Sequence, residues 1–152
     1  MVNNDIISTL NDLIECCKDG EQGFKTCAED ASGLHPKLKA VLRERQLECA
    51  ASASELQSLV RAQGGNPETH STVSGSLHRG WLNIKTAIRG KDDEAVLNEC
   101  ERGEDAAVKN YRKALEKDLP MNIRLIVERQ FQGVLRNHDQ IKVLRNQART
   151  HV

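Results

Sequence analysis

Aromatic side chains are scarce in this chain of 152 residues, where they make up 3% of the sequence. They are Phe24, Trp81, Tyr111 and Phe131. Strands of β-sandwiches and barrels are enriched in aromatic and β-branched residues, so this scarcity argues against an all-β fold. Aliphatic side chains on helices must therefore supply most of the packing.

Net charge and long apolar runs are also missing. The chain has 22 basic and 22 acidic residues, and without an overall field to attract a polyanion we expect no nucleic-acid partner. No segment approaches the roughly 20 apolar residues that span a bilayer. The N-terminus, MVNNDIISTLNDL, lacks the basic start and apolar run of a signal peptide. We therefore expect no membrane partner and a cytoplasmic location.

Paired cysteine motifs are absent as well. The five cysteines are odd in number and show no CxxC spacing, which favours reduced thiols. Cys17, Cys49 and Cys100 lie on or beside inward helix faces and could approach one another. Buried cysteine usually behaves as a small apolar residue, and nothing nearby in the sequence lowers a thiol pKa. A redox role is the alternative.

The chain does contain long stretches of helical periodicity. The first places Leu10, Ile14, Cys17, Glu21, Phe24 and Ala28 at alternating spacings of four and three, which is typical of an amphipathic helix. Gly20 and Gly23 flank Glu21, and glycine inside a helix suggests that another group packs closely there. Together with capping and turn signals, the periodicity predicts helices over residues about 4–30, 36–63, 74–89, 92–117 and 120–149.

The lengths of the connections predict how these helices are arranged. Short turns join the first long helix to the second and the third to the fourth, so each pair should be antiparallel. Residues 64–91 separate the two pairs and include the short helix, which is long enough to make the second and third long helices parallel. We predict an all-α, single-domain chain, 1–152, with the ferritin-like arrangement of two hairpins joined by one long crossover.

Acidic residues share helix faces with apolar ones in this pattern. At 1.5 Å per residue, five metal-ligating side chains fall near one level of the bundle: Glu21, Glu48, Glu101, Glu104 and His138. Buried carboxylates need protonation, arginine or a metal ion, and carboxylate with imidazole suits iron or manganese. One hypothesis is therefore a divalent-metal site, with Glu101 and Glu104 as ligands and His138 supplying nitrogen.

The alternative is that these acids lie at the edges of the helix interfaces. Glu44, Glu48 and Glu101 would then pair with Arg45, Arg102 or Arg129. The protein would be a metal-free interaction module that forms a homodimer or binds another protein.

Three segments resemble a family of proteobacterial proteins described as ferritin-like four-helix bundles without an established activity. They are NDLIECCKDGEQGF, SGSLHRGWLNIKTAIRGKDDEAVLNECERGEDAAVKNYRKALEKDLP and ERQFQGVLRNHDQIKVLR, within which HRGW and ECERGEDAA are the most distinctive. The resemblance implies the fold. Within HRGW, His78 and Trp81 could form a small site at the bundle end, or Trp81 could anchor the crossover while His78 caps it.

Ferritin-like di-iron proteins carry Glu-x-x-His on two helices, and this chain has no such motif: Glu44 is followed three residues later by Leu47, Glu101 by Glu104 and Glu128 by Phe131. This argues against an oxidase. We therefore expect a non-catalytic helical interaction or stress-related module, with a carboxylate-lined site for iron or another divalent metal as the alternative.

Overall fold

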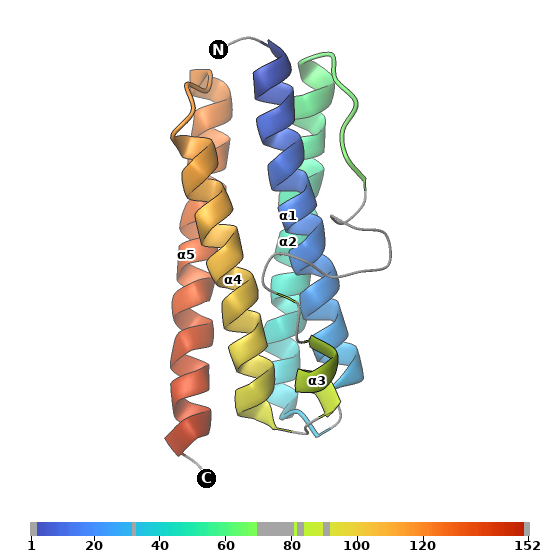
Figure 1. Cartoon of the computed structure of the whole chain (residues 1–152), viewed down its shortest axis with the longest axis vertical. Coiled ribbons are helices and arrows are strands. Elements are labelled where there is room, and N and C mark those ends of the chain that lie inside the picture. Colours follow the sequence, from blue (N-terminus) through green and yellow to red (C-terminus); the bar gives the residue numbers. More distant parts are fainter. Residues whose placement is uncertain (1–2, 32, 70–80, 82–83, 90–91, 151–152) are drawn as a thin grey trace.

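The computed structural model describes residues 3–31, 33–69, 81, 84–89 and 92–150, and it is all-helical over them (Figure 1). The helices are α1 (Asn3–Asp30), α2 (Pro36–Ala62), α3 (Ile84–Arg89), α4 (Asp93–Leu115) and α5 (Met121–Thr150). The all-α prediction is confirmed, and the bounds of the four long helices agree with prediction to within two residues. Most of the predicted start of the short helix, residues 74–83, lies outside the described residues.

Local capping explains where the helices begin. Gly33, between α1 and α2, has φ of +84°, a conformation that favours glycine. Pro36 occupies the first turn of α2, and the Nδ1 atom of His35 accepts a hydrogen bond from the Lys37 backbone N–H at 3.1 Å. At α4, a carboxylate oxygen of Asp92 accepts the Glu94 backbone N–H at 3.0 Å. These caps separate α1 from α2 and fix the start of α4.

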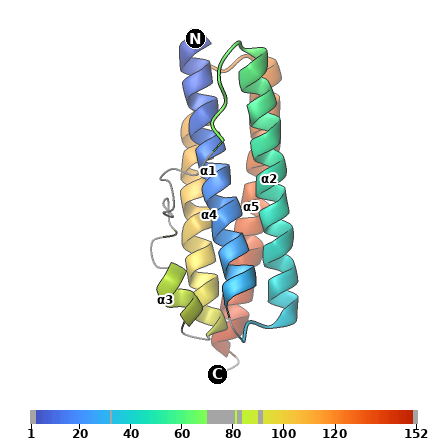
Figure 2. The same cartoon turned by 90° about the vertical axis from the view of Figure 1, so that its right-hand side faces the viewer.

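The four long helices form two antiparallel hairpins, α1 with α2 and α4 with α5. Helices α2 and α4 run in the same direction, so the chain returns along the length of the bundle between them (Figures 1 and 2). The predicted helix directions are therefore confirmed. The short helix α3 packs against α4 and α1. None of the described helices is long and apolar enough to cross a membrane.

The core consists of two apolar clusters at successive levels of the bundle. One includes Leu10, Leu13, Ile14, Leu56, Val60, Tyr111, Ile123 and Val127. The other includes Phe24, Leu42, Trp81, Leu97, Cys100 and Ile141. On α4, Glu104 lies between Cys100 of the second cluster and Ala107, which packs against the first. The boundary between the clusters is therefore where a buried acid enters the core.

Trp81 fixes the chain between the hairpins to the bundle. Its side chain is buried, and its ring meets Phe24 edge to face with centroids 4.9 Å apart. A Cβ atom added at Gly23 of α1 or at Gly103 of α4 would overlap the indole. The close packing expected beside Gly23 is thus confirmed, and Trp81 has the anchoring position. His78, the other half of the small site considered at the bundle end, lies outside the described residues.

Candidate functional site

A buried ion pair joins the two hairpins at the boundary between the apolar clusters. Arg45 of α2 donates from Nε to Oε1 of Glu104 on α4 at 2.5 Å, and from Nη2 to Oε2 at 3.5 Å. The Glu104 side chain is 1% exposed. Arg45 also donates from Nη1 to Oε2 of Glu48 at 2.9 Å, and its guanidinium lies 5.6 Å from the centroid of the Phe24 ring. One cation therefore serves two carboxylates and an aromatic ring.

The protonation of this pair depends on a balance between burial and attraction. Burial raises the pKa of Glu104, and the Arg45 charge and hydrogen bond oppose this without reversing it. Burial by itself would lower the pKa of Arg45, but neighbouring Cys49 and Glu104 raise it overall. The guanidinium therefore stays charged, and Glu104 is the member of the pair whose charge can change with pH.

Beside the ion pair lies a cavity of about 20 Å³. Cys17, Cys49, Trp81 and Tyr111 are among the residues that line it. A cavity of this size holds roughly one water molecule, whereas sites for organic ligands enclose on the order of 300 Å³ or more. The described interior at this level therefore has no room for a substrate.

Three of the buried cysteines, two of which line this cavity, have weakly acidic thiols. Burial raises the pKa of Cys17 well above its ordinary value and that of Cys49 to about 12. Burial likewise raises the pKa of Cys100, as do its hydrogen bond and proximity to Cys27. A thiol is nucleophilic only as the thiolate, so these side chains are inert at neutral pH. This agrees with their interpretation as small apolar residues.

Tyr111 connects the thiols to α5 through polar contacts. Its hydroxyl lies 3.3 Å from the Cys17 Sγ atom and donates to Oε1 of Gln130 at 2.8 Å. Gln130, also buried, donates from Nε2 to Oε1 of Glu55 on α2 at 2.8 Å. Burial raises the pKa of Tyr111, so the phenol stays protonated and acts as a structural hydrogen-bond donor.

Basic side chains contact all four glutamates of the predicted metal set. Glu21 pairs with Lys18 of its own helix at 3.2 Å, Glu48 and Glu104 pair with Arg45, and Glu101 pairs with Arg145 of α5. The expected pairing of Glu48 with Arg45 is therefore confirmed. For Glu101 the expected arginines were wrong, because Arg102 pairs with Glu99 and Arg129 with Glu55.

Two of the five predicted ligands do come together, with a third residue that was not predicted. Glu101, Asp105 and His138 each offer a ligand atom, and these atoms lie within 4.8 Å of one another. His138 was expected to face inward but lies at the edge of the bundle, with 20% of its side chain exposed. Asp105 follows Glu101 by four residues on α4, and this spacing was the signal for it in the sequence. Metal binding by the predicted residues stays a prediction.

Among the described residues, buried Glu99 and buried Asp19 were not singled out from the sequence. Neither residue lies on a predicted apolar helix face, so the periodicity gave no signal that either side chain is buried. Glu99 contacts Arg102 three residues later on its own helix at 3.0 Å.

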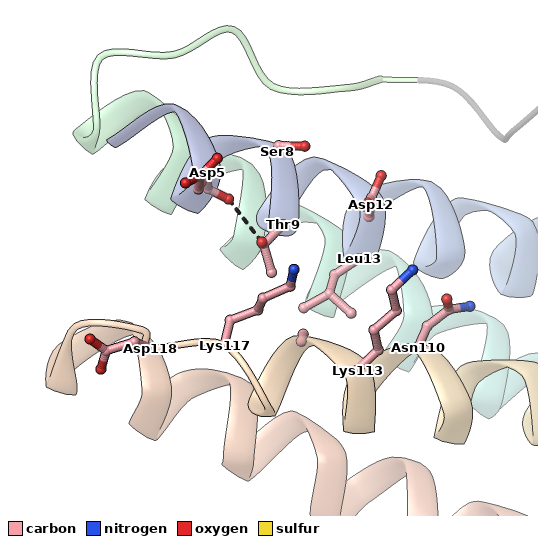
Figure 3. Close-up of a pocket in the computed structure, with 10 residues that line it drawn as sticks. Asp5, Ser8, Thr9, Asp12, Leu13, Asn110, Lys113, Lys117 and Asp118 are labelled. Atoms are coloured by element: carbon pink, nitrogen blue, oxygen red, sulfur yellow. Dashed lines mark hydrogen bonds between the residues drawn. The ribbon is translucent and has the colours of Figure 1, made fainter. Parts of the chain in front are cut away.

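An open groove lies between α1 and α4 near the start of α1 (Figure 3). Its volume is about 560 Å³. Lys113 extends from α4 towards α1, and Lys117 does so from the turn that follows α4 (Figure 3). Asp5, Thr9 and Asp12 of α1 line the other side of the groove. Acids and lysines line the same groove, so it presents no excess of one charge that would select a ligand.

Comparison with known proteins places most of the chain in one family. Residues 5–117 match a family described as "Domain of unknown function (DUF2383)". This match runs from α1 through α4 and includes Arg45, Glu101, Glu104 and Asp105. No curated protein matches the chain.

Proposed function

Because this chain belongs to the family described as a domain of unknown function (DUF2383), we propose its function from its own geometry: it is a ferritin-like four-helix bundle that acts as a non-catalytic interaction module. The order of hairpin, crossover and hairpin, with α2 and α4 parallel, supports the ferritin-like assignment. The resemblance of HRGW and ECERGEDAA to proteobacterial bundle proteins supports a bacterial origin.

The contact of Arg45 with Glu48 and Glu104 is the observation on which the proposal rests. A ferritin-like metal centre draws carboxylates from several helices to one point in the bundle core. Here a guanidinium binds the interior carboxylate of Glu104 at 2.5 Å and the exposed carboxylate of Glu48 at 2.9 Å. The adjacent cavity admits about one water molecule, and the surrounding thiols are protonated. Because this interior has no room for a substrate, binding to a partner must use the outer helix faces.

Apolar side chains on those outer faces support protein binding. Leu47, Met121, Leu125 and Val143 are all more than half exposed. Met121 and Leu125 are four residues apart on α5, and Val143 follows Leu125 by 18 residues, or about five turns at 3.6 residues per turn, so all three share one side of the helix. We expect the partner to be a protein, with a second copy of this chain as the first candidate.

Charge and cysteine chemistry support the setting. The balance of 22 basic and 22 acidic residues gives no field for nucleic acid. All five cysteines are buried and free, which is typical of reducing compartments, so we propose a cytoplasmic protein.

Metal analysis tests whether the interior is closed to metal. The wild type, Glu104→Gln and His138→Asn are purified without chelator, and their bound metal is measured by mass spectrometry. We expect equal metal content in the wild type and in Glu104→Gln. If metal is present in the wild type and in His138→Asn but is lost from Glu104→Gln, then the metal binds in the interior. That result would contradict the proposal. Circular dichroism confirms that each variant is folded.

A further inference from the structure

We propose that Glu101, Asp105 and His138 form a binding site for a divalent transition-metal ion on the outside of the α4–α5 hairpin. Glu101 and Asp105 lie one helical turn apart on α4, and His138 faces them from α5. One ligand atom from each residue lies within 4.8 Å of the other two. The Nε2 atom of His138 is already 2.5 Å from Oδ1 of Asp105.

The donor set determines the class of ion. One imidazole nitrogen with two carboxylate oxygens suits zinc, iron or manganese better than calcium or magnesium, which prefer oxygen alone. Donors around one such ion lie on the order of 3 to 3.5 Å apart, because each is about 2.1 Å from the metal. The Nε2 atom of His138 and Oδ1 of Asp105 are 2.5 Å apart and must therefore separate by roughly half an ångström or more to share an ion. The 58% exposed Asp105 side chain is free to make this adjustment.

His138 presents one ring nitrogen to the cluster. Its Nε2 atom faces the carboxylates, while its Nδ1 atom lies 3.9 Å from Oδ1 of Asp139. An ion would take the place of the proton that Nε2 shares with Oδ1 of Asp105, and the Asp139 carboxylate adds negative charge nearby without a hydrogen bond to the ring. The cluster and this neighbour together supply three negative charges.

Arg145 is a basic side chain that contacts the cluster, and it leaves part of the site open. Its Nη1 atom contacts Oε2 of Glu101, which leaves Oε1 for an ion. Its Nε atom is buried without a hydrogen-bond partner among the described residues. Its single positive charge is smaller than the combined charge of Glu101, Asp105 and Asp139, so the net local charge still attracts a divalent cation.

The site is separate from the closed interior. Glu104 binds Arg45 on the buried side of α4, whereas Asp105, the next residue, is exposed. The two positions differ because successive residues on a helix point about 100° apart. A metal at the outer site therefore requires no change in the buried ion pair.

Titration of the full chain with zinc, and with cobalt as a spectroscopic probe, tests this proposal. We expect one zinc ion per chain by isothermal titration calorimetry and a rise in melting temperature on zinc addition. His138→Asn and Asp105→Asn should each lower zinc affinity at least tenfold. His35→Asn is the matched control, because the same substitution at the cap of α2 retains a capping side chain and should leave affinity unchanged.

The outcomes separate this site from other metal-binding groups. Cobalt bound through nitrogen and oxygen gives weak visible bands, whereas cysteine ligation adds a strong thiolate charge-transfer band. Absence of zinc binding to the folded wild type would overturn the proposal, as would a thiolate band or equal affinity in the wild type and His138→Asn. We expect Glu104→Gln to retain zinc binding, because Glu104 is not a ligand of the outer site. Failure of the outer site would therefore not count against the proposal that the interior is closed to metal.

Discussion

Arg45 shows how a single buried cation can organise two acidic side chains. Moving a guanidinium and a carboxylate out of water costs several kcal/mol per ion, and their mutual attraction offsets this only when the hydrogen bonds are well formed. Arg45 meets that condition with short hydrogen bonds to Oε1 of Glu104 and to Glu48, and its contact with the other oxygen of Glu104 is longer. Such a pair adds little net stability, but losing one member leaves the other charge buried alone.

Replacing Arg45 by methionine tests this imbalance. The substitution keeps an unbranched apolar side chain at this position but leaves Glu104 buried without its counter-charge. We expect Arg45→Met to lower the free energy of unfolding at pH 7 by about 3 to 5 kcal/mol in urea denaturation. The double variant Arg45→Met, Glu104→Leu should recover most of that loss. If the free energy of unfolding of Arg45→Met is within about 1 kcal/mol of the wild-type value, then the buried Glu104 does not depend on the charge of Arg45.

The raised pKa of Glu104 predicts how stability depends on pH. A carboxyl group with a higher pKa in the folded than in the unfolded state binds its proton more tightly when folded, so protonation stabilises the fold. The contribution of Glu104 to stability should therefore rise as the pH falls through its raised pKa and level off below 4.5, its ordinary value. Urea denaturation from pH 8 to pH 4 measures this as the difference between the wild type and Glu104→Gln. A difference that is constant with pH would contradict the raised pKa.

At this scale the sequence predicts which residues face inward but not their partners. Glu104 falls on a predicted inward face, and both Glu104 and Arg45 are buried. Placing residues by helical rise carries an error of about one turn, or about 5.4 Å. That error exceeds the difference between a hydrogen bond and no contact, so the pairing with Arg45 could not be separated from convergence on a metal. The same error explains why Glu104 was predicted beside His138, where the structure has Asp105.

At the scale of elements, Trp81 connects three separate segments of the chain. Its indole occupies space on α1 and α4 that only glycine leaves open, at Gly23 and at Gly103. Glycine inside a helix costs about 1 kcal/mol relative to alanine, so its presence at both positions is a cost that the packing of the indole offsets.

A comparison of two glycines tests this packing. A Cβ atom at Gly103 would overlap Trp81, whereas a Cβ atom at Gly133 of α5 would meet only the flexible Arg136 side chain, at 3.7 Å. We expect Gly103→Ala to destabilise the protein by about 1 to 3 kcal/mol through overpacking, and Gly133→Ala to stabilise it by about 0.5 to 1 kcal/mol. Trp81 is the sole tryptophan, so its fluorescence should shift to the red in Gly103→Ala alone. Equal stability changes in the two variants would contradict the proposed role.

The helices themselves were largely predictable because their signals are local. Capping residues, Pro36 and the apolar periodicity predict the observed bounds, and the glycines beside Glu21 predict close packing on that face. That Trp81 is the group packed against Gly23 was not predictable, because the contact joins residues 58 positions apart in the chain.

At the scale of the whole molecule, the chemistry that joins the hairpins along their α2–α5 edge differs from that in the middle of the bundle. On the α2–α5 side the contacts are polar: Gln130 bonds to Glu55 and to the Ser52 backbone, and Asn137 donates to Glu48 at 2.7 Å. The apolar clusters fill the middle, with contributions from all four long helices. Connection lengths predicted the helix directions, but the uneven polarity depends on side-chain partners that periodicity does not identify.

The exposed apolar residues of α5 lead to a prediction about assembly. Met121 and Leu125 are 67% and 58% exposed and adjacent on the helix surface, so burying them against a second chain would be favourable. We expect the wild type to sediment as a species heavier than the 17.0 kDa monomer, and Met121→Lys, Leu125→Lys to sediment as the monomer. Ser54→Lys, Ser58→Lys places the same two charges four residues apart at exposed positions of α2, and it should associate as the wild type does. If the wild type is monomeric at high concentration, or if both double variants dissociate alike, then α5 does not form a homodimer interface.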